Sequence, residues 1–226
     1  MKHRLTIDPA ATAALFIDLQ EEHRLDKRLL VEDFDRVLRN VGLLQATARE
    51  TGVPLIHFAY VVDTLVHNRR FHPLMPDGKS YFSDKNDPMT EICSEVAPEG
   101  NEPLVVKAEA TGFGTASPEA VLRAQNVEWL VVAGVWSEAC VDATVKDAVK
   151  LGFRVLLVKD ACGSGTQAMH QTAILNLANR LYGGAVASTE AACRLMRGEE
   201  AEVWQVEGAV PIRFTFENAA AHYAAL

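Results

Sequence analysis

The stretch Leu130-Val-Val-Ala-Gly-Val-Trp-Ser-Glu-Ala-Cys-Val141 decides the fold. Its apolar first half is typical of a strand buried on both faces, and a helix is predicted from Ala139 to about Leu151. A glycine turn joins the two elements and places Cys140 at the start of the helix. Unpaired N–H groups and a partial positive charge at a helix N-terminus favour thiolate over thiol. The stretch therefore predicts a chemically primed cysteine.

Five further apolar runs have the length of buried strands, and helical stretches lie between them. Alternation of this kind implies parallel strands joined by right-handed crossovers. We therefore expect an α/β fold of three layers, doubly wound, with a mainly parallel six-stranded sheet and helices on both faces. The strands are predicted at 13–17, 53–60, 103–107, 128–133, 154–158 and 184–188, and the clearest helices at about 33–51, 117–126, 139–151, 167–182 and 189–197.

Two charged residues end predicted strands. Asp18 follows the run at 13–17, and Lys107 closes the run at 103–107. In an open α/β sheet, ligands bind outside the carboxyl ends of the strands, so we expect both residues to meet Cys140 in one crevice. Asp18 as a turn cap and Lys107 as a solvated strand end are the alternative interpretations. An acid, a cation and a thiol together provide a proton acceptor, an electrostatic partner and a nucleophile.

Three motifs occur in a set order: Ala14-Leu-Phe-Ile-Asp-Leu-Gln20, then Val105-Val-Lys107 with Gly112-Phe-Gly-Thr115, then Ala133-Gly-Val-Trp-Ser-Glu-Ala-Cys140-Val. Together they resemble the isochorismatase-like cysteine hydrolases. This superfamily includes nicotinamidases and the hydrolases of N-carbamoylsarcosine, ureidoacrylate, biuret and maleamate. The resemblance covers roughly residues 10–197. One motif alone would be weak evidence, but the ordered set is specific.

The resemblance implies a catalytic triad of Asp18, Lys107 and Cys140. It also implies a cis peptide between Val135 and Trp136, and an oxyanion site formed by the backbone N–H groups of Trp136 and Cys140. Trp136 is bulkier than the residue that many relatives carry, so we expect it to narrow or cap the substrate pocket. Phe113, in the turn after Lys107, is predicted as another wall of that pocket.

The resemblance raises the question of a metal. Nicotinamidases carry an Asp-x-His-x5-His set after the second strand, whereas this chain has Asp63, His67 and His72 at a different spacing. Arginines at 69 and 70 would repel a cation there. We therefore expect no metal and no other cofactor. Arg69 and Arg70 are candidate ligands for a substrate carboxylate, with a solvated loop surface as the alternative. His57, inside a predicted strand, is interpreted as a core histidine.

Three functions compete at this point. The first is a metal-independent cysteine amidohydrolase that cleaves the C–N bond of a small amide or carbamoyl compound through a thioester. The second is a metal-dependent nicotinamidase. The third is isochorismatase-type hydrolysis or a non-catalytic binding role of the same fold. Isochorismate-hydrolysing members lack the cysteine, so Cys140 argues against that activity. The sequence favours the first function and does not name the substrate.

Composition excludes other classes of protein. The chain has 226 residues, of which 49% are hydrophobic and 23% charged, with a formal net charge of −8. An acidic chain is a poor partner for nucleic acid or an anionic membrane. The N-terminus lacks the apolar centre of a signal peptide, so we expect a cytoplasmic protein. The cysteines at 93, 162 and 193 have no C-x-x-C spacing and are expected to be small buried side chains.

Two segments stand apart from the alternating pattern. Residues 63–102 contain several prolines and polar residues and are long for a connection, which indicates a lid or an interface element. We assign residues 1–198 to the hydrolase domain and 199–226 to a C-terminal arm. That arm carries Trp204, Ile212, Phe214 and Phe216 without an obvious place in the core. Exposed apolar patches mark interfaces, so a homodimer or homotetramer is expected.

Overall fold

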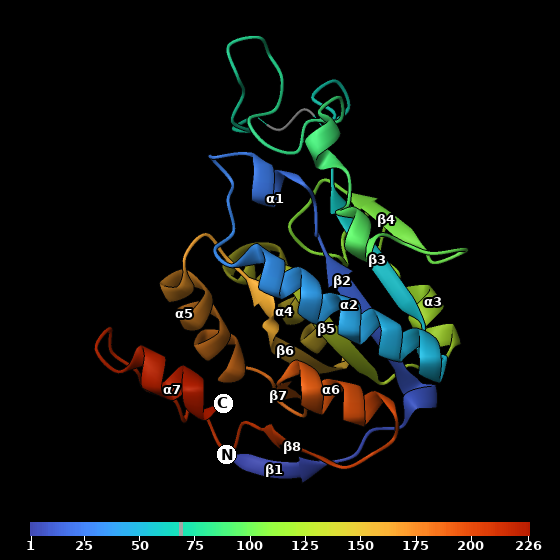
Figure 1. The fold of residues 1–226 in the computed structure, drawn as a ribbon, viewed down its shortest axis with the longest axis vertical. Coiled ribbons are helices and arrows are strands. Elements are labelled where there is room, and N and C mark those ends of the chain that lie inside the picture. Colours follow the sequence, from blue (N-terminus) through green and yellow to red (C-terminus); the bar gives the residue numbers. More distant parts are fainter. Residues whose placement is uncertain (68–69) are drawn as a thin grey trace.

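The computed structural model describes residues 1–67 and 70–226, and these form one sheet flanked by helices (Figure 1). The order of the eight strands within these residues is β1-β8-β7-β6-β5-β2-β3-β4. The strands are β1 (Lys2–Leu5), β2 (Thr12–Ile17), β3 (Leu55–Tyr60), β4 (Leu104–Lys107), β5 (Trp129–Val135), β6 (Arg154–Gly163), β7 (Ala185–Ala187) and β8 (Ala201–Trp204). The α-helices are α1 (Glu22–Leu25), α2 (Phe34–Thr51), α3 (Glu119–Ala124), α4 (Asp142–Lys150), α5 (Gln167–Ala178), α6 (Thr189–Met196) and α7 (Ala219–Ala225).

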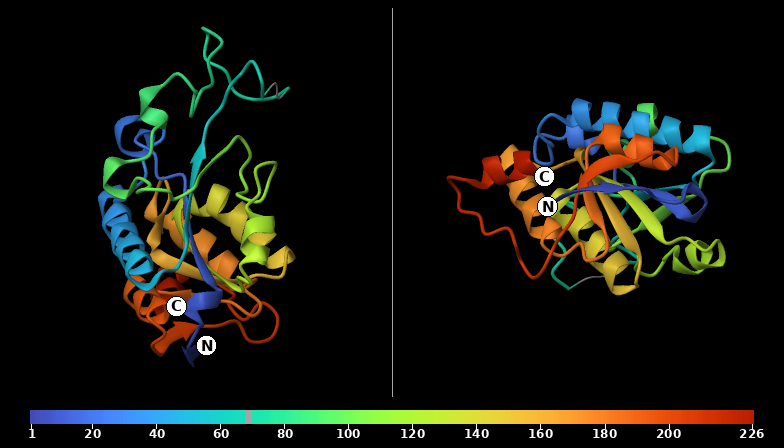
Figure 2. Two further views of the ribbon diagram at one scale, coloured as in Figure 1. Left: turned by 90° about the vertical axis from the view of Figure 1, so that its right-hand side faces the viewer. Right: turned by 90° about the horizontal axis from the view of Figure 1, so that it is seen from below.

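Helices cover both faces of the sheet, as the predicted α/β fold requires. Helices α2 and α6 lie on one face, and α3, α4 and α5 lie on the other (Figure 2). Alternation along β2 explains the two layers: Ala14 and Phe16 join the core under α2 and α6, whereas Leu15 and Ile17 join the opposite core. Both cores are apolar, so the central strands are buried on both faces.

The expected number of strands is wrong: the sheet has two strands more than the six predicted. All six predicted strands are present as β2 to β7, and they pair in parallel. The additional strands β1 and β8 pair antiparallel with each other, and β8 continues the sheet beside β7. Each is four residues long and includes charged side chains, and β1 forms an edge of the sheet, so a search for apolar runs does not find them.

The C-terminal segment 199–226 packs against its own chain. Trp204 in β8 and Ile212 are both buried, so the expectation that they lack a place in the core is wrong. Helix α7 lies beside α5 (Figure 1). Phe216 remains 95% exposed. The homo-oligomer stays a prediction, and it now depends on Phe216 rather than on the whole set of apolar side chains.

The segment between β3 and β4 starts at the carboxyl end of β3, and its described part lies above α1 in Figure 1. Two isolated bridges attach the described part of this segment to the body of the protein, Gln20 with Ile92 and Val62 with Asp84. The Gln20 amide also donates to the carbonyls of Tyr60 and Thr90, at 3.0 and 2.7 Å. The segment is therefore anchored at its base. Among the described residues, no helix is long and apolar enough to span a bilayer.

Gly134 allows β2 and β5 to approach at the end where the site lies. Its φ is +128°, and a Cβ atom there would lie 2.2 Å from the Ile17 carbonyl oxygen. A side chain at this position would force the two strands apart, since the clash is with backbone. Ile17 pairs with both Phe58 and Gly134. The glycine in the fold-deciding stretch therefore fixes the distance between Asp18 and the residues that follow β5.

A polar cluster joins β3 to α2 at the other end of the sheet. The His57 ring contacts Glu102 with Nε2 at 2.9 Å from Oε2, as expected of a core histidine with a partner. Arg49 of α2 donates to both oxygens of Glu102, at 2.7 and 2.9 Å. These bonds, above all those from Arg49, lower the pKa of Glu102 to about 2. The ionised carboxylate is therefore stabilised in the folded state.

Replacing Glu102 tests this cluster. Because its folded-state pKa lies below the ordinary 4.5, the stabilisation is present above about pH 4.5 and is lost as the pH falls toward 2. We expect Glu102→Gln to lower the free energy of unfolding by about 2–3 kcal/mol at pH 7 and by progressively less below pH 4.5. Urea unfolding across pH measures both. Glu99→Gln removes an exposed partner of the same Arg49 and is the control, expected to cost less than about 1 kcal/mol; equal losses in the two variants would contradict the assignment.

Candidate active site

Asp18 and Lys107 form a buried ion pair at the carboxyl edge of the sheet. Asp18 leaves β2 with φ 51°, a left-handed conformation that aspartate tolerates better than most residues. Lys107 ends β4, where it pairs in register with Tyr60. The Lys107 Nζ lies 2.7 Å from Asp18 Oδ2, and both side chains are at most 3% exposed. The structure thus brings together two residues that lie 89 positions apart in the sequence.

Lys107 has further partners that hold it against the acid. Its ammonium group donates to the carbonyls of Glu109 and Ala110, at 3.2 and 3.3 Å. Burial raises the pKa of Asp18, while the charge and hydrogen bond of Lys107 oppose that rise. The Oδ1 atom of Asp18 is buried and accepts no hydrogen bond of normal geometry from the described residues. One oxygen is thus held by Lys107, and the other is available to accept a proton.

Cys140 lies next to this pair. The thiol interacts with both Asp18 and Lys107, and it is partly exposed, whereas the cysteines at 93, 162 and 193 are buried. A π-helical turn, Ser137–Val141, carries Cys140 and leads directly into α4. The helix therefore begins before the predicted Ala139. Turns of this type interrupt the regular helical spacing and occur often at functional sites.

The start of a helix does not by itself make Cys140 a thiolate in the resting protein. Burial and the negative charge of Asp18 raise the pKa of the Cys140 thiol, and Lys107 only partly offsets them. Cys140 is thus a protonated thiol at neutral pH, despite its place at a helix start. A helix N-terminus is worth about 1 kcal/mol, which is small compared with burial beside a carboxylate. The thiol needs a base to become a nucleophile, and Asp18 is the adjacent base.

A small pocket opens beside the thiol. Val135 and Trp136 are joined by a cis peptide, at the bond where the family resemblance places one. The cavity has a volume of about 260 Å³, below the size of most sites for drug-sized ligands. Its walls come from β2, the turn at α1, the end of β3, the segment between β3 and β4, and the turn of Cys140. The lining residues are Asp18, Glu22, His23, Leu29, Tyr60, Phe82, Ser83, Ala110, Val135, Trp136, Ala139 and Cys140.

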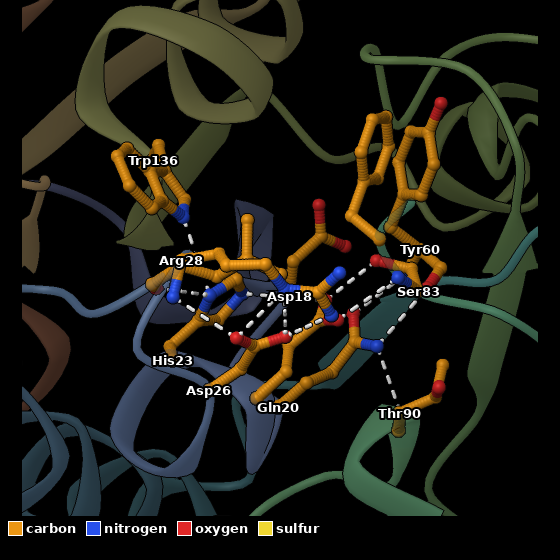
Figure 3. Close-up of polar contacts among 12 residues, drawn as sticks. Asp18, Gln20, His23, Asp26, Arg28, Tyr60, Ser83, Thr90 and Trp136 are labelled. Carbon is orange, nitrogen blue, oxygen red and sulfur yellow. Dashed lines mark hydrogen bonds and ion pairs between the residues drawn. The ribbon is translucent and has the colours of Figure 1, made fainter. Parts of the chain in front are cut away.

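Trp136 forms part of the pocket wall. Its indole N–H donates to His23 Nδ1 at 3.2 Å, and Figure 3 shows the indole directed toward the imidazole. Only a neutral imidazole offers a lone pair at Nδ1, so the proton of His23 lies on Nε2. Burial lowers the pKa of His23 to about 4, which keeps the ring neutral. His23 therefore orients Trp136 without adding charge.

Sequence reasoning missed Glu22, His23, Phe82 and Ser83. The first two follow Gln20 within a short helix, and the others come from the long segment after β3. No apolar period marks either region. The one available signal was position: Glu22 and His23 lie four and five residues after the candidate Asp18, at the carboxyl edge of the sheet. The contribution of Phe82 and Ser83 to the pocket fits the lid expected in segment 63–102.

Two predicted substrate contacts fall elsewhere. Phe113 is absent from the pocket lining and stacks on Phe153, with ring centroids 5.9 Å apart, in the core on the α4 side. The sequence could not set the direction of a side chain that follows a glycine turn. Arg70 is exposed and lies over the Phe71 ring, away from the pocket. Arg69 lies outside the described residues.

The residues considered for a metal do not converge. Asp63 pairs with Lys85, and the Asp63 backbone N–H donates to His67 Nδ1 at 3.0 Å. His72 contacts the Ser80 hydroxyl at 2.6 Å. Within the described ranges, no three histidine, cysteine or acidic side chains are grouped as metal ligands. The donor set of a nicotinamidase is therefore not assembled by these residues.

Residues 12–191 match the isochorismatase domain. The chain belongs to the isochorismatase family. Maleamate amidohydrolase from Pseudomonas putida is 29% identical over 66% of this chain and 70% of its own length. Ureidoacrylate amidohydrolase RutB from Pseudomonas syringae pv. syringae is 25% identical over 84% of this chain and 85% of its own.

Solved structures of this family share the fold. A cysteine hydrolase from Pseudomonas syringae pv. phaseolicola superposes with a TM-score of 0.74 at 21% identity. The match covers 85% of this chain and 95% of the solved one. At this identity the likeness supports the α/β architecture and carries no statement about substrate.

Replacing Lys107 tests the ion pair. Lys107→Met leaves the Asp18 carboxylate buried without its partner, and breaking such a pair costs about 3–5 kcal/mol. We expect a loss of that size in the free energy of unfolding at pH 7, measured with urea. Lys85→Met removes an exposed pair with Asp63 and is expected to cost less than about 1 kcal/mol. A Lys107 variant as stable as this control would show that the pair does not stabilise the fold.

Proposed function

We propose that this protein is a metal-independent cysteine amidohydrolase that cleaves the C–N bond of a small amide or carbamoyl compound. The observation that carries the proposal is the buried Asp18–Lys107 pair beside a thiol that lines a small pocket. The relatives named amidohydrolases support the same reaction class. The roles of individual residues follow from their protonation states and positions.

Asp18 acts first, as the general base. Its Oδ1 accepts the proton of the Cys140 thiol, and the resulting thiolate attacks the carbonyl carbon of the amide. The carbonyl π electrons move to oxygen and form a tetrahedral oxyanion. Burial raises the pKa of Asp18, and the charge and hydrogen bond of Lys107 oppose that rise, so Lys107 favours the ionised carboxylate that accepts the proton.

The oxyanion requires donors that are already in place. We assign this role to the backbone N–H groups of Trp136 and Cys140, which border the pocket. Collapse of the intermediate breaks the C–N bond, and the leaving nitrogen takes the proton held by Asp18. Cys140 is then joined to the acyl group as a thioester.

Water completes the cycle. Asp18 accepts one proton from the water, whose oxygen attacks the thioester carbon, and the C–S bond breaks. The departing sulfur recovers the proton from Asp18, so the resting thiol and carboxylate are restored. The products are an acid and ammonia or an amine, and no step requires a metal or a redox partner.

The nucleophile is tested by Cys140→Ser. We expect release of ammonia from a panel of small amides and carbamoyl compounds to fall at least about 10³-fold, because a serine hydroxyl is a much weaker nucleophile than a thiol activated by Asp18. A cooperative urea unfolding curve similar to that of the wild-type protein would show that the variant is folded.

Cys193→Ser is the matched control, because this buried thiol lies far along the chain in α6 and is expected to leave turnover unchanged. Mass spectrometry of wild-type protein quenched during turnover should find the acyl adduct on the peptide containing Cys140. An active Cys140→Ser protein, or an adduct on another cysteine, would refute the assignment.

Metal independence has its own test. We expect dialysis against a chelator to leave the rate of ammonia release unchanged, and elemental analysis of the purified protein to find less than stoichiometric zinc, iron or manganese. The reason is that Asp63 pairs with Lys85, His67 Nδ1 accepts the Asp63 backbone N–H, and His72 contacts Ser80. Activity that is lost with the metal and regained with one added ion per chain would support the nicotinamidase alternative instead.

A further inference from the structure

A second carboxylate lines the pocket. Glu22, in the short helix α1, is 4% exposed and borders the same cavity as Cys140. Its Oε2 accepts the Ser83 backbone N–H at 2.9 Å, and its Oε1 accepts the Ser83 hydroxyl at 2.5 Å. Burial and two hydrogen bonds from the segment between β3 and β4 therefore hold the Glu22 side chain in place.

Glu22 keeps acceptor capacity toward the pocket. A carboxylate has about four lone-pair sites, of which Ser83 occupies two. The Nε2 atom of His23 lies 4.0 Å from Oε1, beyond hydrogen-bond distance. A ligand that places an N–H group against Glu22 would thus complete its bonding, whereas a ligand carboxylate at the same place would meet like charge.

The charges around the pocket do not cancel. Asp18 and Lys107 neutralise each other, and His23 is neutral because it accepts a bond from Trp136. Among the described lining residues there is no arginine or lysine. Arg28 lies nearby, but its guanidinium is bound to Asp26 (Figure 3). The guanidinium also lies over the Tyr81 ring, 4.7 Å from its centroid. Glu22 is left as a carboxylate without a cationic partner among these residues. Burial and the negative charges of Asp18 and Asp26 raise its pKa, whereas the two hydrogen bonds donated by Ser83 oppose that rise and favour the ionised form.

We propose that Glu22 selects the substrate by charge, so that the pocket takes uncharged amides bearing a second N–H group and rejects amides whose acyl part ends in a carboxylate. This inference rests on the proposed amidohydrolase function. It separates the chain from the relatives named for maleamate and ureidoacrylate, both of which are carboxylates. A diamide or a urea derivative fits the described chemistry: one carbonyl faces Cys140, and the remote N–H group faces Glu22.

Matched substrate pairs test the selection in the wild-type protein. Maleamide and maleamate, and likewise malonamide and malonamate, differ only by a remote carboxamide or carboxylate. We expect kcat/KM for ammonia release to favour the uncharged member of each pair by at least about tenfold, the scale of one like-charge contact at a partly buried site. Preference for the carboxylates would overturn the inference while leaving the amidohydrolase proposal intact.

A chemical probe gives an answer that does not depend on turnover. Iodoacetamide and iodoacetate alkylate thiols similarly but differ in charge, so the ratio of their rates at Cys140 reports the local potential. We expect the ratio of the iodoacetamide rate to the iodoacetate rate at Cys140 to be at least about tenfold higher than the same ratio for a small free thiol at the same pH and ionic strength. A ratio equal to that of the free thiol would refute the charge selection, even if none of the amides is hydrolysed.

Glu22→Gln identifies the residue responsible. The amide keeps an acceptor for Ser83 and removes the charge, so we expect the alkylation ratio to approach that of the free thiol and the preference within each substrate pair to shrink about tenfold. Glu21→Gln is the control: this neighbouring acid pairs with Arg24 outside the pocket and is expected to leave both ratios unchanged. If both variants behave alike, the effect belongs to the net charge of the protein and not to Glu22.

Discussion

The buried ion pair between Asp18 and Lys107 is the interaction on which the site depends. Burying either charge alone would cost free energy, because only a close partner of opposite charge and further hydrogen bonds offset the loss of hydration. Lys107 has both, because two backbone carbonyls accept its remaining protons. Lys107 therefore opposes the protonation of Asp18 that burial favours. Burial and the nearby carboxylate also raise the pKa of Cys140, so in the proposed mechanism the proton is on sulfur before the substrate binds.

The sheet makes this pair possible. Parallel strands present their carboxyl ends at one edge, and β2 lies between β3 and β5 while β4 flanks β3. Lys107 must therefore reach across β3 to meet Asp18, which its long side chain allows. Gly134 completes the arrangement, since its missing side chain lets β5 lie against Ile17 and brings the turn of Cys140 close to the acid. Backbone geometry thus sets the distances on which the chemistry relies.

The sequence predicted those parts of the site that follow from topology. Asp18, Lys107 and Cys140 stand at the ends of predicted strands or at the start of a helix, so a rule about strand ends was enough to bring them together. Glu22 and Ser83 were not predictable in this way, because their partnership joins a short helix to a long segment without periodicity. Phe113 was misplaced, because the direction of a side chain after a glycine turn depends on packing against Phe153. Strands β1 and β8 were missed because each has only four residues and includes charged side chains.

Charge balance links the nucleophile to the pocket. In the proposed mechanism, the proton transfer between Cys140 and Asp18 leaves their total charge unchanged, so the potential that an entering substrate meets is set by the groups that do not react. Of these, Lys107 is tied to Asp18, and His23 must stay neutral to accept the indole N–H of Trp136. Among the described lining residues, Glu22 is the remaining acidic group, and its two hydrogen bonds from Ser83 connect it to the segment between β3 and β4. The same carboxylate therefore joins that segment to the body of the protein and, in the charge selection proposed above, determines the charge that an entering substrate meets.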